Sequence, residues 1–147
     1  MSSWAAFAAE QPEFAAEVLA SLRVQKHMTL ATVRADGSPR ISGTEIQLDG
    51  DDVTIGSMPR ALKAHDLQRD PRFALHAPTV DPPPGDHNAW VGEAKIAGLA
   101  IETSAPDAEA HAFRLDLHEV VHTRVRADQL EIRSWHPGRG LEVRQRD

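Results

Sequence analysis

The segment from Ser57 to Arg72 carries the residue types best suited to holding a phosphate group. Its pattern predicts a strand end, a Ser57 cap and a short helix that Pro71 prevents from running on. Backbone N–H groups at a helix start lack intrahelical partners and can donate to an anion. Arg60 and Lys63 lie three residues apart and would share one helix face. The segment therefore predicts a phosphate site, with a solvated basic face as the alternative.

A second candidate is His118-Glu119-Val120-Val121-His122, which matches the His-Glu-x-x-His pattern of zinc peptidases. On a helix, residues four apart are about 6 Å apart and can share one metal ion. On a strand they are roughly 13 Å apart, which is too far. The β-branched residues of this stretch favour a strand. We therefore expect no metal site, and we expect His118 and His122 to lie on a polar strand face, while a zinc peptidase stays the third functional hypothesis.

Composition excludes several other classes of protein. The chain has no cysteine, which rules out disulfides and thiol chemistry and suits the reducing cytoplasm. No apolar run approaches the roughly 20 residues of a membrane span, and the N-terminus lacks a signal-peptide pattern. A net charge of −6, with no tyrosine, four Phe and three Trp, argues against nucleic-acid binding. We expect a cytoplasmic protein without membrane or nucleic-acid partners.

No familiar catalytic motif is visible, so the sequence identifies no catalytic residue. It contains no Gly-x-Ser-x-Gly, Gly-x-x-x-x-Gly-Lys or Gly-x-Gly-x-x-Gly pattern. Chemistry in a chain of 147 residues would more naturally come from a bound cofactor.

The elements that must position these residues are mostly short strands within one domain, residues 1–147. We expect an amphipathic helix over 11–26, a barrel over about 28–144, an exposed proline-rich loop over 78–88 and a brief helical connection over 105–112. The predicted strands are 28–33, 40–48, 53–55, 73–75, 90–101, 117–125, 129–135 and 141–144. The first three would form two consecutive hairpins, and Gly92 and Gly98 would permit bends or close backbone approach in the long strand. The fold class is mainly β, an antiparallel barrel of six to eight strands with helices as connectors.

Four segments, in order, resemble the pyridoxamine 5′-phosphate oxidase-like split-barrel family, which binds FMN or the deazaflavin F420. The most informative is Lys63-Ala64-x-x-Leu67-x-x-Asp70-Pro71-Arg72, a helix that follows the third strand. The other three are residues 30–39, 90–95 and 132–140, so that the resemblance spans roughly residues 20–140. It implies a Greek-key-like split barrel and a homodimer with two cofactors in clefts between the subunits.

The resemblance also implies where the cofactor would lie. The isoalloxazine or ribityl chain would be edged by the second-strand residues Arg40, Ser42, Gly43 and Thr44. The phosphate would be held by Ser57, Arg60 and Lys63, of which Lys63 is the most direct match. The residues that could reach the cofactor from the partner subunit are His87 or Asn88. All nine identities stand in the sequence.

Two departures from the family pattern bear on activity. Members that oxidise pyridoxine phosphate hold it with tyrosine and a C-terminal arginine–histidine segment, whereas this sequence has no tyrosine and ends soon after Gly140. Gly56-Ser57 also replaces the tyrosine–threonine pair that often ends the third strand. We therefore expect not vitamin B6 oxidation but an FMN- or F420-dependent oxidoreductase acting on an unidentified small molecule. The alternative is a non-catalytic flavin, deazaflavin or haem carrier.

Overall fold

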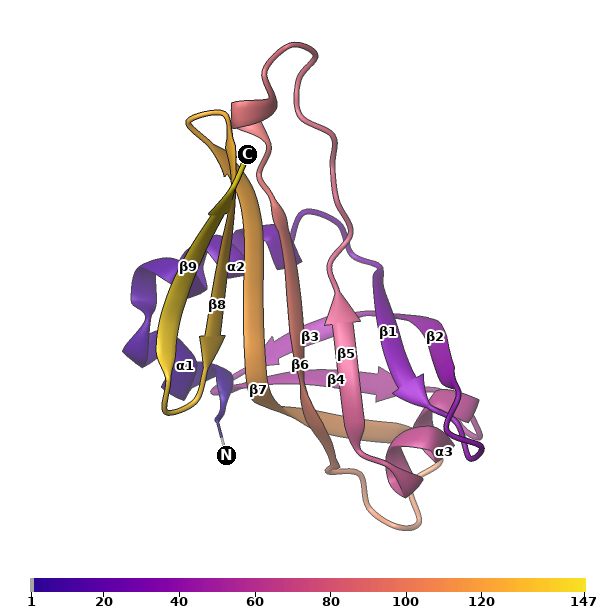
Figure 1. The fold of residues 1–147 in the computed structure, drawn as a ribbon. Coiled ribbons are helices and arrows are strands. Elements are labelled where there is room, and N and C mark those ends of the chain that lie inside the picture. Colours follow the sequence, from indigo (N-terminus) through magenta and orange to yellow (C-terminus); the bar gives the residue numbers. More distant parts are fainter. Residues whose placement is uncertain (1) are drawn as a thin grey trace.

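The computed structural model describes residues 2–147; Met1, the first residue of the expected domain, lies outside them (Figure 1). The described residues form one antiparallel sheet of nine strands in the order β2-β1-β5-β6-β7-β4-β3, with β8 added to β7 and β9 to β8. The strands are β1 Met28–Val33, β2 Pro39–Thr44, β3 Ile46–Asp49, β4 Asp52–Ser57, β5 Arg72–His76, β6 Glu93–Glu102, β7 His111–Arg126, β8 Gln129–His136 and β9 Gly140–Arg146. The mainly β split barrel is confirmed, with more strands than the six to eight predicted.

The extra strand arises because the predicted strand 40–48 is divided at Glu45. Residues before it form β2, which pairs with β1, and residues after it form β3, which pairs with β4. The two predicted hairpins are therefore confirmed, but β2 and β3 have different neighbours, so the predicted meander is interrupted. The bend at Glu45 is a consequence of this change of partner.

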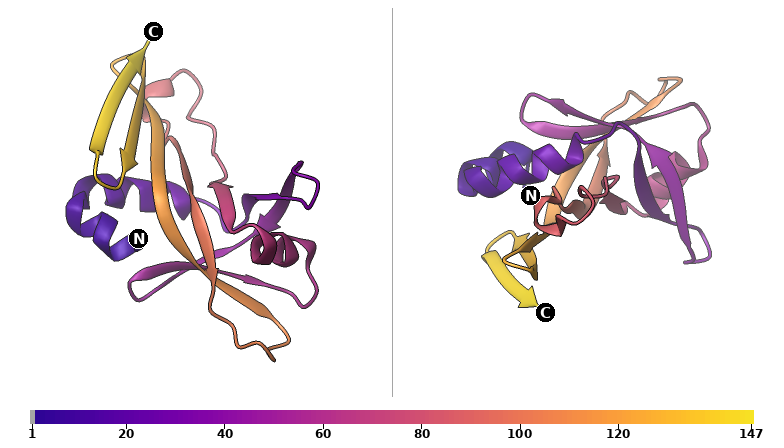
Figure 2. Two further views of the ribbon diagram at one scale, coloured as in Figure 1. Left: turned by 60° about the horizontal axis from the view of Figure 1, so that its bottom comes forward. Right: turned by 90° about the horizontal axis from the view of Figure 1, so that it is seen from above.

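The long strand β7 joins all parts of the sheet. Its first residues pair with β4, its central stretch pairs with β6, and its last residues pair with β8. The register with β6 shifts between Ala97 and Gly98. A side chain at Gly98 would collide with the carbonyl oxygen of Asp116, which confirms the close backbone approach predicted there. Figures 1 and 2 show β7 bending as it passes from the barrel to the β8–β9 hairpin.

Two helices cover one side of the molecule, next to β8 and β9 (Figures 1 and 2). They are α1, Trp4–Glu10, which sequence analysis did not predict, and α2, Pro12–Leu22. The predicted helix 11–26 was too long, because the chain turns at Arg23 to enter β1. Buried aromatic side chains fix the pair to the sheet, and the rings of Phe7 and Trp135 lie 4.8 Å apart.

The third helix, α3 Leu62–Arg69, packs at the other side, against β1 and β2. The prediction that Ser57 caps it was wrong. Ser57 ends β4, a turn follows, and the N-cap is Ala61. Arg60 in that turn has a left-handed φ of 61°, a conformation that no helical residue adopts. The helix therefore starts later than the cap pattern indicated.

The predicted helical connection over 105–112 is also wrong. The chain makes turns there, and β7 begins at His111, which pairs with Ser57 across the sheet. Hydrogen bonding to β4 outweighs the helix propensity of a short alanine-containing stretch. The loop after β5 is as exposed as predicted and contains a short 3₁₀ helix, η1 His87–Ala89.

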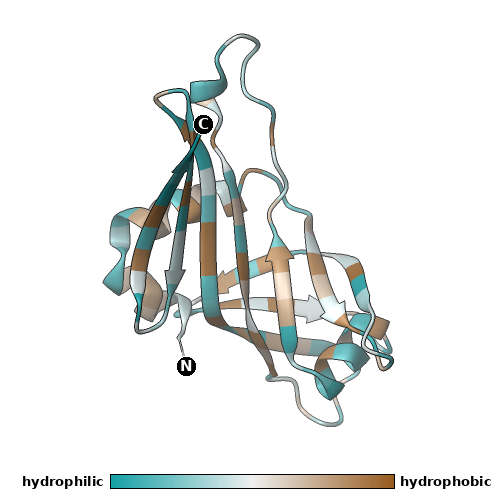
Figure 3. Cartoon of the chain, viewed as in Figure 1, coloured by the Kyte–Doolittle hydropathy of each residue, from teal (hydrophilic) through white to brown (hydrophobic). Residues whose placement is uncertain are grey.

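The core lies inside the barrel and under α1 and α2. Figure 3 shows hydrophobic residues along the central strands and hydrophilic ones at the end of β9. The largest fully buried side chains are Trp135, Phe7, Phe113, Leu22, Leu30, Leu75, Ile96, Leu115 and Leu117, with Val18, Val53 and Val120. Among the described residues, the helices are all too short or too polar to cross a membrane.

Candidate functional site

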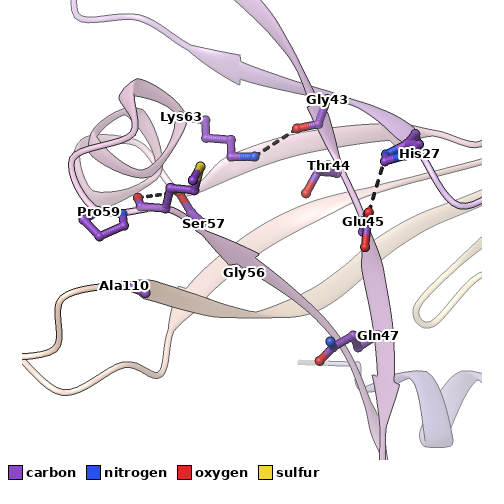
Figure 4. A pocket seen from close by; sticks show the side chains of 11 residues that line it. His27, Gly43, Thr44, Glu45, Gln47, Gly56, Ser57, Pro59, Lys63 and Ala110 are labelled. Carbon is purple, nitrogen blue, oxygen red and sulfur yellow. Dashed lines mark hydrogen bonds and ion pairs between the residues drawn. The ribbon is translucent and has the colours of Figure 1, made fainter.

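A cleft of about 730 Å³ opens between the β2–β3 bend, the end of β4 and the start of α3 (Figure 4). The bend contributes Gly43, Thr44 and Glu45, and the end of β4 contributes Gly56 and Ser57. The remaining lining residues are His27, Gln47, Met58, Pro59, Lys63 and Ala110. The cleft therefore lies where four segments of the chain meet, at residues 27, 43–47, 56–63 and 110.

Lys63 brings a positive charge into this cleft from the first turn of α3. Its ammonium donates a hydrogen bond of 2.9 Å to the carbonyl oxygen of Gly43 (Figure 4). An ammonium has three N–H donors, and this contact uses one. The hydroxyl of Ser57 also lines the cleft and makes a weak 3.3 Å contact to the Met58 carbonyl. These groups can donate to the oxygens of an anionic ligand.

Thr44 provides the clearest sign that the cleft receives a polar group. The residue is only 6% exposed, and its Oγ1 is buried without a hydrogen-bond partner among the described residues. Leaving a buried hydroxyl unpaired costs about 1–3 kcal/mol. The Lys63 ammonium and the Ser57 hydroxyl form a donor set that fits a phosphorylated cofactor. Thr44 Oγ1 would pair with a ligand oxygen or N–H group once the cleft wall over it moves.

The other side of the cleft is acidic. Glu45 lies across from Lys63 in Figure 4, with the His27 Nδ1 at 3.5 Å and the Lys26 ammonium at 3.8 Å from its carboxylate oxygens. A phosphate would be repelled by the Glu45 carboxylate and attracted by Lys63. The cleft thus has a direction, with its anion-binding end at Lys63 and an end suited to hydroxyl or N–H donors at Glu45.

Four of the nine residues named from the sequence come together at this cleft: Gly43, Thr44, Ser57 and Lys63. Ser42 and Arg60 do not line it. The expectation that Arg60 and Lys63 share a helix face was wrong, because Arg60 precedes the helix in its left-handed turn.

His87 and Asn88 lie in η1, at the opposite end of the molecule from α3 (Figure 1). Both side chains bind the carboxylate of Asp128 in the β7–β8 turn, at 3.0 and 2.8 Å. The Asp128 backbone N–H also donates to the amide oxygen of Asn88, at 3.1 Å. They do not reach the cleft of their own chain, and a contact from a partner subunit stays a prediction.

Arg40, the ninth residue, contacts Asp66 and does not line the cleft. Asp66 lies on α3, is 3% exposed, and accepts hydrogen bonds from Arg40 Nε at 2.8 Å and Thr32 Oγ1 at 2.7 Å. A third comes from Arg69 at 3.1 Å. Burial would raise the pKa of Asp66, but these bonds, first that from Arg40 and then that from Thr32, outweigh burial and lower it.

The role of Asp66 was not predicted from the sequence, although a signal was present. The residue directly precedes Leu67, one of the apolar positions that face the sheet. A carboxylate beside the apolar stripe of a short helix predicts a buried partner, and Arg40 on a neighbouring strand was available.

The His118–His122 pair lies on strand β7, as predicted, but the expected polar face was wrong for His122. His118 is exposed and bonds Asp116 at 2.9 Å. His122 is 2% exposed, because α2 and the segment at Gly92 cover it. Among residues 2–147, no cluster of three or more histidine or acidic side chains is arranged to hold a metal ion.

His122 belongs to a buried polar network that the sequence did not disclose. Its Nδ1 lies 2.9 Å from Arg133 Nη2, and its Nε2 lies 2.9 Å from Ser21 Oγ. Because the guanidinium can only donate, the imidazole is neutral, with its proton on Nε2 and directed at Ser21. Burial, followed by the nearby Arg133 charge, lowers the pKa of His122 to about 4.

Glu17 on α2 completes this network by binding two arginines. It accepts from Arg124 Nη1 at 3.0 Å and from Arg133 Nη2, while Glu131 accepts from Arg124 Nε at 2.8 Å. Burial raises the pKa of Glu17, but the Arg133 hydrogen bond and the two arginine charges outweigh it, so the pKa is lowered. The network fixes α2 to β7 and β8.

Solved structures with the same fold cover nearly the whole chain. PhzG from Burkholderia lata 383, in complex with tetrahydrophenazine-1-carboxylic acid, has a TM-score of 0.65 and 13% identity, over 96% of this chain and 91% of its own. A pyridoxamine 5′-phosphate oxidase-related, FMN-binding protein from Nostoc punctiforme PCC 73102 has a TM-score of 0.64 and 12% identity, over 93% and 96%. A heme-binding protein from Mycobacterium smegmatis has a TM-score of 0.59 and 12% identity, over 88% and 86%.

No curated protein sequence matches the chain. The family model described as pyridoxamine 5′-phosphate oxidase matches residues 14–124, which contain the cleft, α3 and the strands around them. The chain belongs to the pyridoxamine 5′-phosphate oxidase family.

Proposed function

We propose that the cleft binds the phosphate and ribityl end of FMN, with F420 as the alternative, in an oxidoreductase that acts on an unidentified small molecule. The observation that carries the proposal is the Lys63 ammonium in the lining of the cleft, together with the Ser57 hydroxyl and the unpaired Thr44 hydroxyl. The description of the Nostoc neighbour as FMN-binding supports FMN as the first choice.

Different residues of the cleft would bind different parts of the cofactor. Lys63 would hold the phosphate and keep its bond to Gly43, which fixes the direction of the ammonium. Thr44 and Ser57 would donate to phosphate or ribityl oxygens, and Glu45 would accept from hydroxyl or N–H groups further along the cofactor. A bound flavin or deazaflavin supplies hydride or electron transfer. The chain's own part is to bind the cofactor, orient it and exclude water.

The protein would act as a homodimer. Large apolar side chains are exposed on the segments that border the cleft: Ile41 on β2 is 74% exposed, Met58 after β4 is 79% exposed, and Leu62 on α3 is 61% exposed. A second subunit would remove these side chains from water and close the open cleft. The absence of cysteine from the sequence supports the cytoplasm as its place of action.

A second candidate is a non-catalytic haem or flavin carrier. It is favoured by the similarity to the heme-binding protein of Mycobacterium smegmatis and by His27 on the rim of the same cleft. Turnover with a reductant and an artificial electron acceptor separates the two candidates, because only the oxidoreductase would consume the reductant catalytically.

An absorbance and fluorescence titration with FMN, then F420, then haem tests the proposal. We expect saturable FMN binding at one cofactor per subunit. Lys63→Met should weaken it by about 1.5–3 kcal/mol, roughly 10- to 150-fold, because one charge-assisted hydrogen bond is lost. Lys95→Met, which removes an exposed lysine on β6, is the matched control and should leave affinity unchanged. Equal affinity of wild type and Lys63→Met would exclude Lys63 as the phosphate ligand.

A further inference from the structure

A buried carboxylate fastens α3 to the first hairpin of the sheet. Asp66 accepts from Thr32 on β1 and from Arg40 on β2, and these two residues are direct partners in the β1–β2 ladder. Arg69, one turn further along α3, bonds both Asp66 and the Val33 carbonyl oxygen, at 3.1 and 2.7 Å. The contacts therefore join three elements at one position of the ladder.

The same helix carries Lys63 three residues earlier. Residues three apart on a helix are neighbours on its surface, so Asp66 and Lys63 both face β2. Lys63 reaches Gly43 on that strand, and Asp66 reaches Arg40, roughly 10 Å away along β2. Two contacts between one helix and one strand fix both the rotation of the helix and its position along the strand.

Few other buried contacts orient this helix. It has eight residues, too few to be stable alone, and its buried apolar anchors are Ala64 and Leu67. Two apolar contacts hold a helix against a sheet but do not direct its polar side chains. The exposed Gln68 amide donates to Glu102 at 2.9 Å, and Arg69 donates to the Val33 carbonyl oxygen at 2.7 Å. The buried directional bonds, which face the β1–β2 hairpin, come from the Asp66 carboxylate.

We propose that Asp66 is a positioning residue for the phosphate-binding Lys63: by locking α3 onto the β1–β2 ladder, its carboxylate aims the Lys63 ammonium at the Gly43 end of the cleft. The inference rests on the proposed function. Arg40, which we expected from the resemblance to border the isoalloxazine or ribityl chain, would then act through Asp66 and not on the cofactor itself.

A double-mutant cycle with two ligands tests the proposal. FMN and riboflavin differ by the phosphate group, so a residue that positions a phosphate ligand should affect only FMN. We expect Asp66→Asn to weaken FMN binding about tenfold and riboflavin binding less than twofold. In a Lys63→Met background, Asp66→Asn should cause no further loss. Asp70→Asn is the charge-matched control, since Asp70 bonds exposed Arg72 at the other end of α3, and it should leave FMN affinity unchanged.

Three results would overturn the inference: an equal loss for FMN and riboflavin, a loss that persists without Lys63, or no loss at all. If Asp66→Asn does not fold, Arg40→Gln loosens the same contact from the strand side and should show the same selectivity for FMN with a smaller effect.

A readout without ligand separates this inference from the proposed function. The chain has three lysines, Lys26, Lys63 and Lys95, so labelling with an amine reagent, read by mass spectrometry, contains its own controls. Asp66→Asn should raise the labelling rate of Lys63 several-fold relative to the other two, and Asp70→Asn should not. If wild type binds neither flavin, the proposed function fails while the positioning role is still decided by labelling. An unchanged Lys63 rate would then refute it.

Discussion

The two sides of the barrel differ in what surrounds their polar groups, although each side has a buried atom without a hydrogen-bond partner, such as Arg133 Nε on the α2 side. Beside α2, the ring nitrogens of His122 and the carboxylates of Glu17 and Glu131 all have partners. Beside α3, the Thr44 hydroxyl has none in the described chain, and it borders an open cleft. On the α2 side the paired groups hold elements of the fold together, whereas on the α3 side the hydroxyl without a partner lies in the lining of an open cleft.

The largest expected effect on stability lies on the α2 side. Arg133→Met should destabilise the protein by about 3–5 kcal/mol, because it removes one of the two arginines that bind Glu17 and Glu131 and leaves the buried His122 Nδ1 without its donor. Urea unfolding measures this loss. Arg139→Met, the same change at an exposed turn, should stay within about 0.5 kcal/mol of wild type. FMN affinity of Arg133→Met should be unchanged; a selective loss of FMN binding would contradict the division of the barrel into a structural and a binding side.

The next effect is a loss of stability in acid that originates at His122. Its pKa is lowered in the folded state, from 6.5 to about 4, so between these values only the unfolded chain takes up the proton. Stability should therefore be complete above pH 6.5 and fall toward pH 4, by up to about 3 kcal/mol. Unfolding curves at several pH values measure the slope. His122→Gln should flatten it, and exposed His118→Gln should not; equal slopes in all three proteins would remove His122 as the cause.

The smallest expected effect, that of Thr44→Val, tests most directly whether the Thr44 hydroxyl serves a ligand and not the stability of the fold. Thr44→Val removes a hydroxyl that has no partner, so the ligand-free protein should keep or gain up to about 1 kcal/mol of stability. The same variant should lose about 0.5–1.5 kcal/mol of FMN affinity. Thr32→Val, where the hydroxyl binds Asp66, is the matched control and should lose about 1–3 kcal/mol of stability. Loss of stability in Thr44→Val would indicate that this hydroxyl is already paired within the protein.

Local turn chemistry made much of the fold predictable from the sequence. Gly37 and Gly50 take the left-handed φ values of 86° and 60° that hairpin turns require, and the two hairpins form around them. Helix α1 could also have been predicted from the sequence, because Ser3 is a favoured N-cap residue and Trp4 and Phe7 follow it at helical spacing. In the structure the Ser3 side chain accepts a hydrogen bond from the Ala6 N–H.

What the sequence could not disclose depends on partners far away in the chain. The division at Glu45 follows from pairing with two different strands, and the burial of His122 follows from the packing of α2 over β7. The cap at Ser57 was misjudged because β4 pairs through Ser57 with His111, more than fifty residues later. Lys63 lines the cleft as the sequence led us to expect, because its signal lies within a single short segment. The partner of Arg40, Asp66, lies 26 residues away and was not predicted.

The way β7 is shared has a consequence for folding. Strand β7 has sixteen residues and pairs with β4, β6 and β8. Within the described chain, it is the only strand that connects the β8–β9 hairpin to the barrel strands of the sheet. If β7 itself loses its extended conformation, β6 on one edge and β4 and β8 on the other all lose their hydrogen-bonding partner. We therefore expect the domain to unfold in one cooperative step, with the amide hydrogens of central β7 exchanging with solvent only through global unfolding.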